Sequence, residues 1–169
     1  MSTVPIRRAT GADLHLLPAL EALADTVFDT LGFGALPAPG TVEAFAGARL
    51  VLVAGDPPVG LARLEEVDGF AHLEQLSVHP EHHGRGIGGE LLEAAFHEAV
   101  AVLGYPAMTL CTFADVAWNG PFYVRHGFEP LETLTPGLRR LQEKERAEGL
   151  EAMGRRVVMI RRAAGGKAT

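Results

Sequence analysis

The sequence predicts an α/β or α+β domain built around a mixed sheet. Three observations lead to this fold class. Apolar runs of strand length alternate with helix-periodic stretches along the chain. The dipeptide Asp68-Gly69 is a strong hairpin signal between two strand-like runs. A glycine-rich segment, residues 84–89, then leads into an amphipathic helix.

The first third of the chain predicts two strands and two helices. A strand over residues 5–9 precedes a helix with Thr10 or Asp13 as its N-cap, and apolar residues at helical spacing mark the buried face of this helix. The segment GFGALPAPG, rich in Gly and Pro, interrupts the helical pattern. This loop, a short helix and a strand follow in order at residues 32–40, 41–48 and 49–54.

The rest of the chain predicts a hairpin, three helices and three further strands. Leucines and alanines at helical spacing indicate the first of these helices, and Gly104 ends it. Asn119 is a candidate cap of the short second helix, which Gly127 ends, and Thr135-Pro136 opens the charged third helix. The elements follow the turn at residues 55–58 in this order: hairpin strands 59–67 and 70–78, helix 88–103, strand 107–113, helix 119–125, strand 128–134, helix 135–149 and strand 155–162.

Composition limits the classes of protein that this chain can represent. Its 169 residues fit one domain, residues 1–169, and 47% hydrophobic with 21% charged residues excludes wholesale disorder. A net charge of −6 argues against nucleic-acid and anionic-membrane partners. Cys111, the single cysteine, lies mid-strand and predicts a buried thiol rather than a disulfide or a nucleophile. The start lacks a signal-peptide pattern and no apolar run approaches ~18 residues, so we expect a cytoplasmic protein.

The hairpin register places a polar group on one face of the sheet. With a two-residue turn, Glu65 opposes His72 and Arg63 opposes Glu74, and opposed residues share a face. One interpretation is a solvated face with a cross-strand Arg63–Glu74 ion pair. The other is a proton-accepting site. The sequence leaves both open.

The glycine-rich segment between strand and helix is suited to an anion. Its four glycines, at residues 84, 86, 88 and 89, let main-chain N–H groups approach a phosphate at a helix N-terminus. The alternative to an anion site is a flexible turn that binds no ligand. A P-loop would need Gly-Lys-Ser/Thr, which is absent. The spacing of Gly84, Gly86 and Gly89 matches a dinucleotide fingerprint, but that fingerprint should open a parallel βαβ unit, and here an antiparallel hairpin precedes it.

Two segments together resemble the GNAT superfamily of acyl-CoA-dependent N-acyltransferases. The segment LEQLSVHPEHHGRGIGGELL is similar to the family's motif A, and WNGPFYVRHGFEP resembles its motif B. The resemblance implies the family's fold, a mostly antiparallel central sheet flanked by helices. One position departs from the family pattern, because His83 stands where Arg or Gln is usual. The helper charge there is therefore weaker or pH-dependent.

The resemblance also implies acetyl-CoA as cosubstrate and assigns residues to it. Main-chain groups of Leu76, Ser77 and Val78 would bind pantetheine and polarise the thioester carbonyl, where the strands ending at Val78 and starting at Ala107 splay apart. Asn119 is assigned either to the cofactor or to capping its helix. The remaining cofactor-binding positions implied are His83, Gly84, Arg85, Gly86, Ile87, Gly88, Gly89 and Phe122.

The implied reaction is transfer of an acetyl group to a primary amine of a small molecule or peptide. An alkylamine with a pKa near ~10 needs a base before it attacks, and Glu74 is our first candidate, His72 our second. Tyr123 is the candidate general acid for the departing thiolate; alternatively it is a core aromatic residue. The acidic net charge favours a cationic acceptor by steering. The loop at residues 32–40 forms one wall of the acceptor pocket, with Phe33 as a contact, or is a plain connector.

Other functions stay open at this stage. A non-catalytic acyl-CoA or nucleotide-binding sensor on the same fold is the main alternative, and an NAD-binding oxidoreductase is the second. Four histidines in the hairpin and loop lack an ordered metal-ligand spacing, so we expect no metal. The segment after Thr135 is long enough to pack on a second subunit, which leaves a homodimer open.

Overall fold

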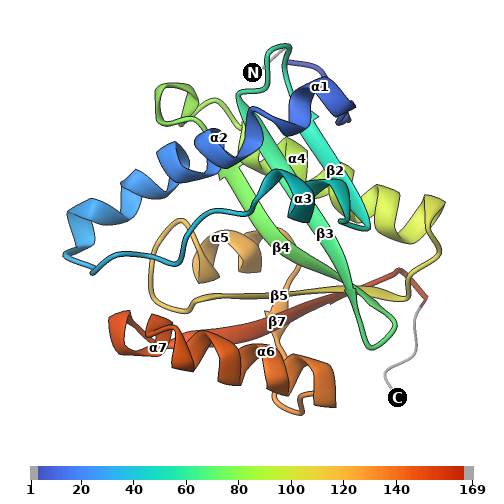
Figure 1. The fold of residues 1–169 in the computed structure, drawn as a ribbon. Coiled ribbons are helices and arrows are strands. Elements are labelled where there is room, and N and C mark those ends of the chain that lie inside the picture. The colour runs from blue at the N-terminus through green and yellow to red at the C-terminus, as the bar shows by residue number, and fades with distance from the viewer. Residues whose placement is uncertain (1–3, 166–169) are drawn as a thin grey trace. The chain divides into compact units, whose positions relative to one another are not determined.

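The structure, a computed structural model, describes residues 4–165 and divides the chain into two compact units (Figure 1). The N-terminal unit comprises residues up to 65 together with 74–95. The C-terminal unit comprises residues 66–73 together with those from 96 onward. Both hairpin strands contribute residues to both units. The single domain over residues 1–169 stays a prediction.

The described residues form a seven-stranded mixed sheet of order β1-β2-β3-β4-β5-β7-β6. Pairs β1–β2, β2–β3, β5–β7 and β6–β7 are antiparallel, whereas β4–β5 is parallel. The predicted mixed, mostly antiparallel sheet with flanking helices is confirmed. The strand bounds are β1 Ile6–Arg8, β2 Leu50–Ala54, β3 Gly60–Val67, β4 Phe70–Val78, β5 Ala107–Phe113, β6 Glu129–Pro130 and β7 Arg156–Arg162.

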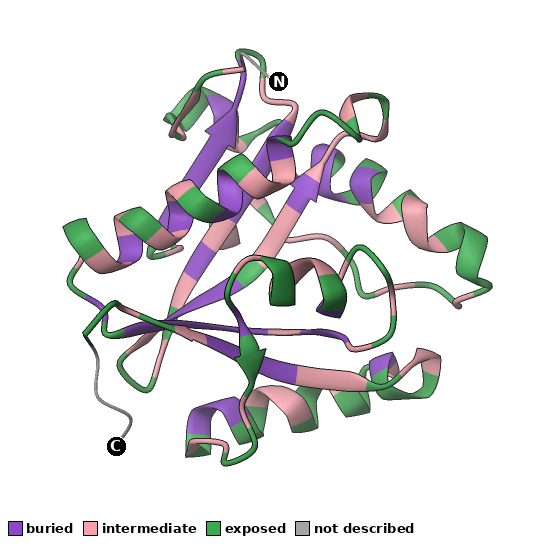
Figure 2. Cartoon of the chain, turned by 180° about the vertical axis from the view of Figure 1, so that it is seen from behind, coloured by how far each residue is buried: buried purple, intermediate pink, exposed green. Residues whose placement is uncertain are grey.

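Two helices of the N-terminal unit pack on strands β2 and β3 through a shared apolar cluster. The buried cluster consists of Leu17, Leu20, Phe45, Val51, Val53 and Leu61. Figure 2 shows the strands largely buried, whereas the helices alternate buried and exposed residues. The helical elements that begin here are α1 Gly11–Leu14, α2 Leu17–Ala24, the 3-10 segment η1 Asp25–Leu31, α3 Val42–Ala46, the 3-10 turn η2 Pro80–His82 and α4 Ile87–His97.

The single helix predicted after Thr10 is three elements. Pro18 lies in the first turn of α2, where its missing N–H costs nothing, but it could not continue a helix from α1. Thr10 is the N-cap of α1, and Asp13 completes the cap from inside the helix. The Asp13 carboxylate accepts the Thr10 N–H at 2.7 Å and two guanidinium N–H groups of Arg7 at 2.6 and 3.0 Å. The Arg7 guanidinium holds the pKa of Asp13 well below its usual range.

We expect Asp13→Asn to lower the free energy of unfolding by about 1 kcal/mol at pH 7, because it disrupts this cap. The folded-state pKa of Asp13 is lowered, so its stabilisation is complete above about pH 4 and is lost as the pH falls. Urea unfolding should therefore show a smaller gap between wild type and variant at pH 2.5 than at pH 7.

Asp56→Asn is the matched control for Asp13→Asn. Asp56 faces the same Arg7 at 3.8 Å, but its side chain is 86% exposed, so its loss should change stability little. An equal loss in the free energy of unfolding in both variants would show that the Asp13 cap stabilises the protein no more than an exposed ion pair does.

The C-terminal unit is built on the β5–β7 ladder, which runs from Ala107↔Arg162 to Phe113↔Arg156. The predicted strand over residues 128–134 is wrong in extent, because only Glu129–Pro130 pairs with β7. Pro130 has no N–H to donate to a ladder, which suits a short edge strand. The other elements of this unit are the π-helical turn η3 Glu98–Val102, α5 Gly120–Arg125, α6 Pro136–Ala147 and α7 Leu150–Met153. The predicted helix 88–103 is thus α4 followed by η3.

The hairpin turn also fastens the start of α6. Asp68 and Gly69 have φ values of 50° and 83°, as a tight hairpin turn requires. The Asp68 carboxylate accepts the Gly137 N–H at 2.6 Å, and hydrogen bonds from the Thr135 side chain and this N–H lower the Asp68 pKa. Gly137 is needed here, because a Cβ would lie 2.6 Å from Asp68 Oδ2.

Cys111 belongs to a partly buried polar contact rather than to a reactive site. Its Sγ donates to Glu145 Oε2 at 2.9 Å, and Arg156 binds both oxygens of the Glu145 carboxylate. Arg156 also lies 4.5 Å from the centroid of the Phe113 ring. Burial raises the pKa of the Cys111 thiol to about 12.

Native protein should therefore react slowly with Ellman's reagent at pH 8, because almost no thiolate is present at Cys111. The same protein in guanidinium chloride should react at the rate of an ordinary cysteine. The measurement is the absorbance of the released thiol chromophore under both conditions. Fast labelling of the native protein would contradict the buried thiol.

Among the residues that the structure describes, no helix has the length and apolar character needed to cross a bilayer.

Candidate active site

The segment between β4 and α4 is an ordered turn. The His79 carbonyl accepts the His82 N–H at 2.8 Å, and the Pro80 carbonyl accepts the His83 N–H at 3.2 Å. His79 Nδ1 accepts the Glu81 N–H at 3.1 Å. The rings of His79 and His82 meet edge to face with centroids 5.7 Å apart. The turn thus brings the chain from the end of β4 to the glycines.

The glycines form an open main-chain surface at the start of α4. Gly84 and Gly86 have φ values of 76° and 80°, a region that L-residues rarely adopt. A Cβ at either position would meet nothing within 4 Å. Glu90 donates its N–H to the Gly86 carbonyl at 3.0 Å, so the N–H groups before Glu90 precede the hydrogen-bond ladder of α4. Main-chain donors at a helix start are suited to an anion.

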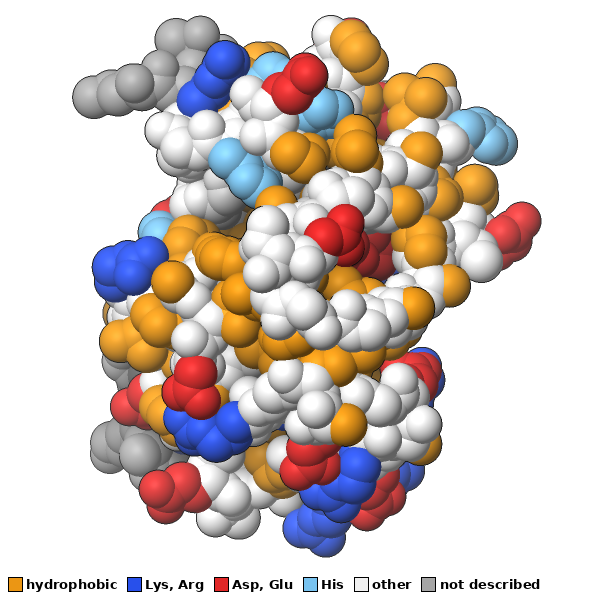
Figure 3. Space-filling view, turned by 90° about the vertical axis from the view of Figure 1, so that its left-hand side faces the viewer, with side chains coloured by type: hydrophobic (Ala, Val, Ile, Leu, Met, Phe, Trp, Pro, Cys, Tyr) orange, Lys and Arg blue, Asp and Glu red, His pale blue; other side chains and the backbone are white. Residues whose placement is uncertain are grey.

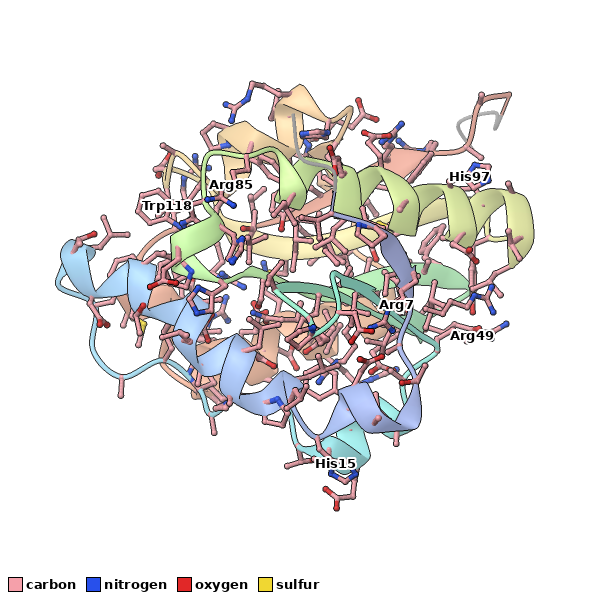
Figure 4. All side chains as sticks on the ribbon, turned by 90° about the horizontal axis from the view of Figure 1, so that it is seen from above. Arg7, His15, Arg49, Arg85, His97 and Trp118 are labelled. Carbon is pink, nitrogen blue, oxygen red and sulfur yellow. The ribbon has the colours of Figure 1, made fainter. Side chains whose placement is uncertain are left out.

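Two side chains of this loop have separate roles. His83 Nε2 lies 2.9 Å from the Val78 carbonyl oxygen, and because a carbonyl only accepts, Nε2 carries the proton. The His83 ring thereby fastens the loop to the end of β4. Arg85 is exposed on the loop that precedes α4 (Figure 4), and its Nη1 lies 3.4 Å from His82 Nδ1. Arg85 is thus an exposed cation beside the glycines.

Close packing under the loop holds β4 and α4 together. Gly60 on β3 has no room for a side chain, since a Cβ there would lie 2.9 Å from Leu91 Cδ1 and 3.2 Å from the Ser77 carbonyl. The Val59 carbonyl accepts the His79 N–H at 2.8 Å just after β4 ends. Ser77 is buried, whereas Leu76 and Val78 are half-buried. These contacts position the three β4 residues that the sequence assigns to pantetheine.

Arg63 is the centre of the polar group on β3 and β4. Its guanidinium lies 3.4 Å from Glu65 and 3.7 Å from Glu74, which confirms the predicted cross-strand ion pair. Arg63 Nε is buried and has no hydrogen-bond partner among residues 4–165, so its interaction with Glu65 is one of charge only. The Glu74 side chain is 36% exposed and can still reach water. Burial raises the pKa of Glu65, and the nearby Glu74 charge adds to this effect.

The sequence reasoning missed two acidic groups in the N-terminal unit. Glu21 is buried and accepts the Gly40 N–H at 3.1 Å, and burial raises its pKa. Burial also raises the pKa of Asp25 to about 6, although the Gln75 side chain donates a hydrogen bond to it. The available signal was their spacing: Leu17, Glu21 and Asp25 recur every four residues, on the face that packs inward.

His72 is a buried side chain rather than part of a solvated face. It is 3% exposed, and its Nδ1 lies 2.9 Å from Thr109 Oγ1, its register partner across β4 and β5. The structure therefore pairs Glu65 and Glu74 with Arg63 and places His72 in the core. This burial favours Glu74 over His72 as a proton acceptor.

Tyr123 is held in an aromatic group of the C-terminal unit. Its ring lies 5.1 Å from that of Phe122 and 5.8 Å from that of Phe128, both at steep angles. Burial raises the Tyr123 pKa above its ordinary value, and the Arg156 charge opposes this shift. The hydroxyl has no recorded hydrogen-bond partner within the described part of the chain. Tyr123 therefore stays protonated at neutral pH with a proton to give.

Asn119 does not cap α5 with its side chain, which corrects one of its two expected roles. Its Oδ1 accepts the Thr112 hydroxyl at 2.8 Å, while its main-chain carbonyl accepts the Tyr123 N–H at 3.0 Å. Gly120 follows at a position where a Cβ would collide with the Ala114 carbonyl. The side chain of Asn119 thus ties α5 to β5, and its amide NH₂ remains as a donor.

The strands around the glycines correct the prediction that an antiparallel hairpin sets this loop apart from a βαβ unit. A hairpin does precede the glycines, but β4 and β5 are parallel neighbours, paired from Ala71↔Met108 to Leu73↔Leu110. The loop and α4 therefore connect two parallel strands, as in a βαβ unit. Among the described residues no group of three or more His, Cys, Asp or Glu side chains could hold a metal ion.

Comparison with known proteins identifies the family. A profile described as "Acetyltransferase (GNAT) domain" matches residues 47–130, which include β4, the glycine loop, α4 and α5. A Bacillus subtilis (strain 168) protein named "Uncharacterized N-acetyltransferase YjcF" is 32% identical over 97 residues. That match covers 56% of this chain and 66% of the relative, just under two thirds of its length.

Solved structures share the fold at lower identity. The PaiA N-acetyltransferase from Thermoplasma acidophilum, in complex with coenzyme A, has a TM-score of 0.68 at 17% identity, covering 96% of this chain and 100% of that one. N-acetylglutamate synthase from Neisseria gonorrhoeae, complexed with coenzyme A and N-acetyl-glutamate, has a TM-score of 0.68 at 20% identity, covering 96% of this chain and 35% of that one. With the two sequence motifs, the profile match identifies residues 47–130 as a GNAT acetyltransferase domain, and the solved structures share the fold of the chain.

Proposed function

We propose that this protein transfers an acetyl group from acetyl-CoA to a primary amine. The observation that carries the proposal is the open main-chain surface at Gly84 and Gly86, placed at the start of α4 within the matched family region. Two structural neighbours are named as complexes with coenzyme A, which supports a cosubstrate of this type.

The residues at the loop fit a diphosphate. Gly84 and Gly86 lie just before α4 and face open space, so oxygen atoms can approach the backbone at the start of the helix. Arg85 adds an exposed positive charge. His83 does not replace the side-chain donor that an Arg or Gln would offer to the diphosphate, because its Nε2–H is already hydrogen-bonded to the Val78 carbonyl.

Main-chain groups of β4 would bind the remainder of the cosubstrate. Leu76, Ser77 and Val78 offer N–H and carbonyl groups to pantetheine as an added strand would. One amide in this stretch would polarise the thioester carbonyl. Asn119 and Phe122 of the C-terminal unit complete the proposed cofactor residues, Asn119 through its amide NH₂.

The reaction needs one proton acceptor and one proton donor. The amine nitrogen forms a bond to the thioester carbon, and the carbon–sulfur bond breaks. Glu74 takes the proton that the nitrogen loses, directly or through water, and Tyr123 gives its proton to the departing thiolate. Partial exposure supports the role of Glu74. Tyr123 is supported as the donor because its phenol is protonated at neutral pH and its hydroxyl has no hydrogen-bond partner among the described residues.

A non-catalytic acyl-CoA sensor is the alternative on the same fold, and turnover distinguishes the two. A second subunit stays a prediction, as do the cytoplasmic location and the absence of metal.

Gly86→Ala should raise the Kd for coenzyme A by about tenfold in isothermal titration, because the positive φ strains an L-residue and shifts the loop. Gly104→Ala is the matched control: Gly104 has a φ of 78° and equally open space, but lies after η3. Equal affinity in both variants would contradict the loop as the diphosphate site. Binding of NAD without coenzyme A would overturn the proposed function.

Tyr123→Phe and Glu74→Gln should each lower kcat by about 10²-fold while coenzyme A affinity stays within about twofold, because each removes one proton-transfer group. The assay follows thiol release from acetyl-CoA with a panel of primary amines. Glu65→Gln removes the other carboxylate beside Arg63 and should leave the rate nearly unchanged. Wild-type rates in both catalytic variants would remove these roles, and no turnover with any amine would favour the sensor.

A further inference from the structure

A pocket of about 230 Å³ opens in the N-terminal unit beside η1 and the loop that follows it. Its volume is below the range of drug-sized sites and suits part of a small molecule. Figure 3 looks onto the end of the structure where η1 lies and shows acidic side chains recessed among hydrophobic ones. The residues that matter for its chemistry are Asp25, Phe28, Asp29, Phe33, Leu36 and Pro37.

The walls of the pocket suit an apolar body that carries positive charge. Phe28 and Phe33 stack with centroids 5.9 Å apart and an interplanar angle of 15°. Aromatic faces attract cations as well as apolar groups. Asp25 and Asp29 are the charged residues among those lining the pocket, and the described lining contains no Lys, Arg or His. A carboxylate-bearing ligand would therefore meet repulsion without a counter-charge.

Asp25 is the polar feature that most needs a partner. It is partly buried, and the Gln75 side chain donates a hydrogen bond to it. Loss of water raises its pKa to about 6, so at pH 7 it is mostly ionised but poorly solvated. A cation placed against it would replace the lost solvation.

The surroundings of Asp25 carry surplus negative charge. The charges of Asp25 and Glu74 raise the pKa of Glu21, whereas Arg63 lowers it. Arg63 is already paired with Glu65 and Glu74. One cation therefore serves several carboxylates, and a second cation from a ligand would be stabilised electrostatically.

A hydrogen-bonded chain links the pocket to β4. Gln75 donates to Asp25 and also, through Nε2, to Ser77 Oγ at 2.9 Å. Ser77 lies in the part of β4 to which the proposed function assigns the thioester. A ligand bound at Asp25 is thus connected, within the N-terminal unit, to that stretch of strand.

We propose that this pocket is the acceptor site and that it selects amines with a second positive charge on an apolar chain and no carboxylate. Asp25 holds the non-reacting ammonium group as a specificity residue, and the other amino group reacts. This inference rests on the proposed function and names its substrate class.

Three acceptors of matched chain length test the charge rule: 1,5-diaminopentane, pentylamine and 6-aminohexanoate. Thiol release should give a kcat/KM for the diamine at least tenfold above that for the monoamine, and the carboxylate compound should be the poorest. Asp25→Asn should lower kcat/KM for the diamine at least tenfold, mainly through KM, and change pentylamine by less than threefold. Asp25→Glu should restore part of the preference.

Glu43→Gln is the control. Glu43 is exposed on α3, so this substitution removes one negative charge outside the pocket. Coenzyme A affinity of Asp25→Asn, measured by isothermal titration, shows whether the variant is folded. Equal kcat/KM for diamine and monoamine, or equal losses on both in Asp25→Asn, would overturn the inference while leaving the acetyltransferase function standing.

If no amine reacts, the proposed function fails, but a titration still tests whether the pocket binds a diamine. Diaminopentane is titrated into wild type and into Asp25→Asn. Tighter binding to wild type supports the pocket as a cation site, and equal binding refutes it.

Discussion

The hydrogen-bonding demand of the first turn of α4 is the constraint on which the proposed site depends. A helix cannot satisfy the N–H groups of its own first turn, and here the chain enters the helix through Gly84 and Gly86, which carry no side chain and face open space. The surroundings hold this turn in place. Gly60 allows α4 to pack closely on β3 and β4, and His83 fastens the loop to the carbonyl of Val78. An anion is the natural partner for donors arranged in this way.

The second organising feature is electrostatic and lies in the same unit. Arg63 is surrounded by more carboxylates than it can neutralise, and burial raises the pKa of two of them, Glu21 and Glu65. Such a group is costly to maintain unless it has a use, and groups with shifted pKa values gather at functional sites. In the two proposals, the loop binds the diphosphate and the acidic pocket binds a cation, as a reaction between a CoA thioester and a charged amine requires.

Local sequence signals predicted most of the fold. Asp68-Gly69 placed the hairpin, Thr10 and Thr135 marked helix starts, and the apolar run at residues 107–113 is β5. The errors arose where tertiary contacts compete with local preference. Asn119 has an N-cap sequence position, yet its side chain bonds Thr112 instead. The run at residues 128–134 has strand composition, but only Glu129 and Pro130 pair in register with β7, and Leu131 adds one hydrogen bond to Val158.

The sequence by itself determined the family and the glycine loop, because both depend on residues that are adjacent in the chain and on the backbone freedom of glycine. It also identified Glu74 and Tyr123 as groups with the right chemistry. Only the tertiary structure decided which polar groups lose water and which find partners. His72 enters the core, whereas Asp25 is brought to Gln75, fifty positions away in the chain, and its pKa rises. The burial of a side chain depends on residues that are distant in the sequence, so a local sequence pattern cannot predict it.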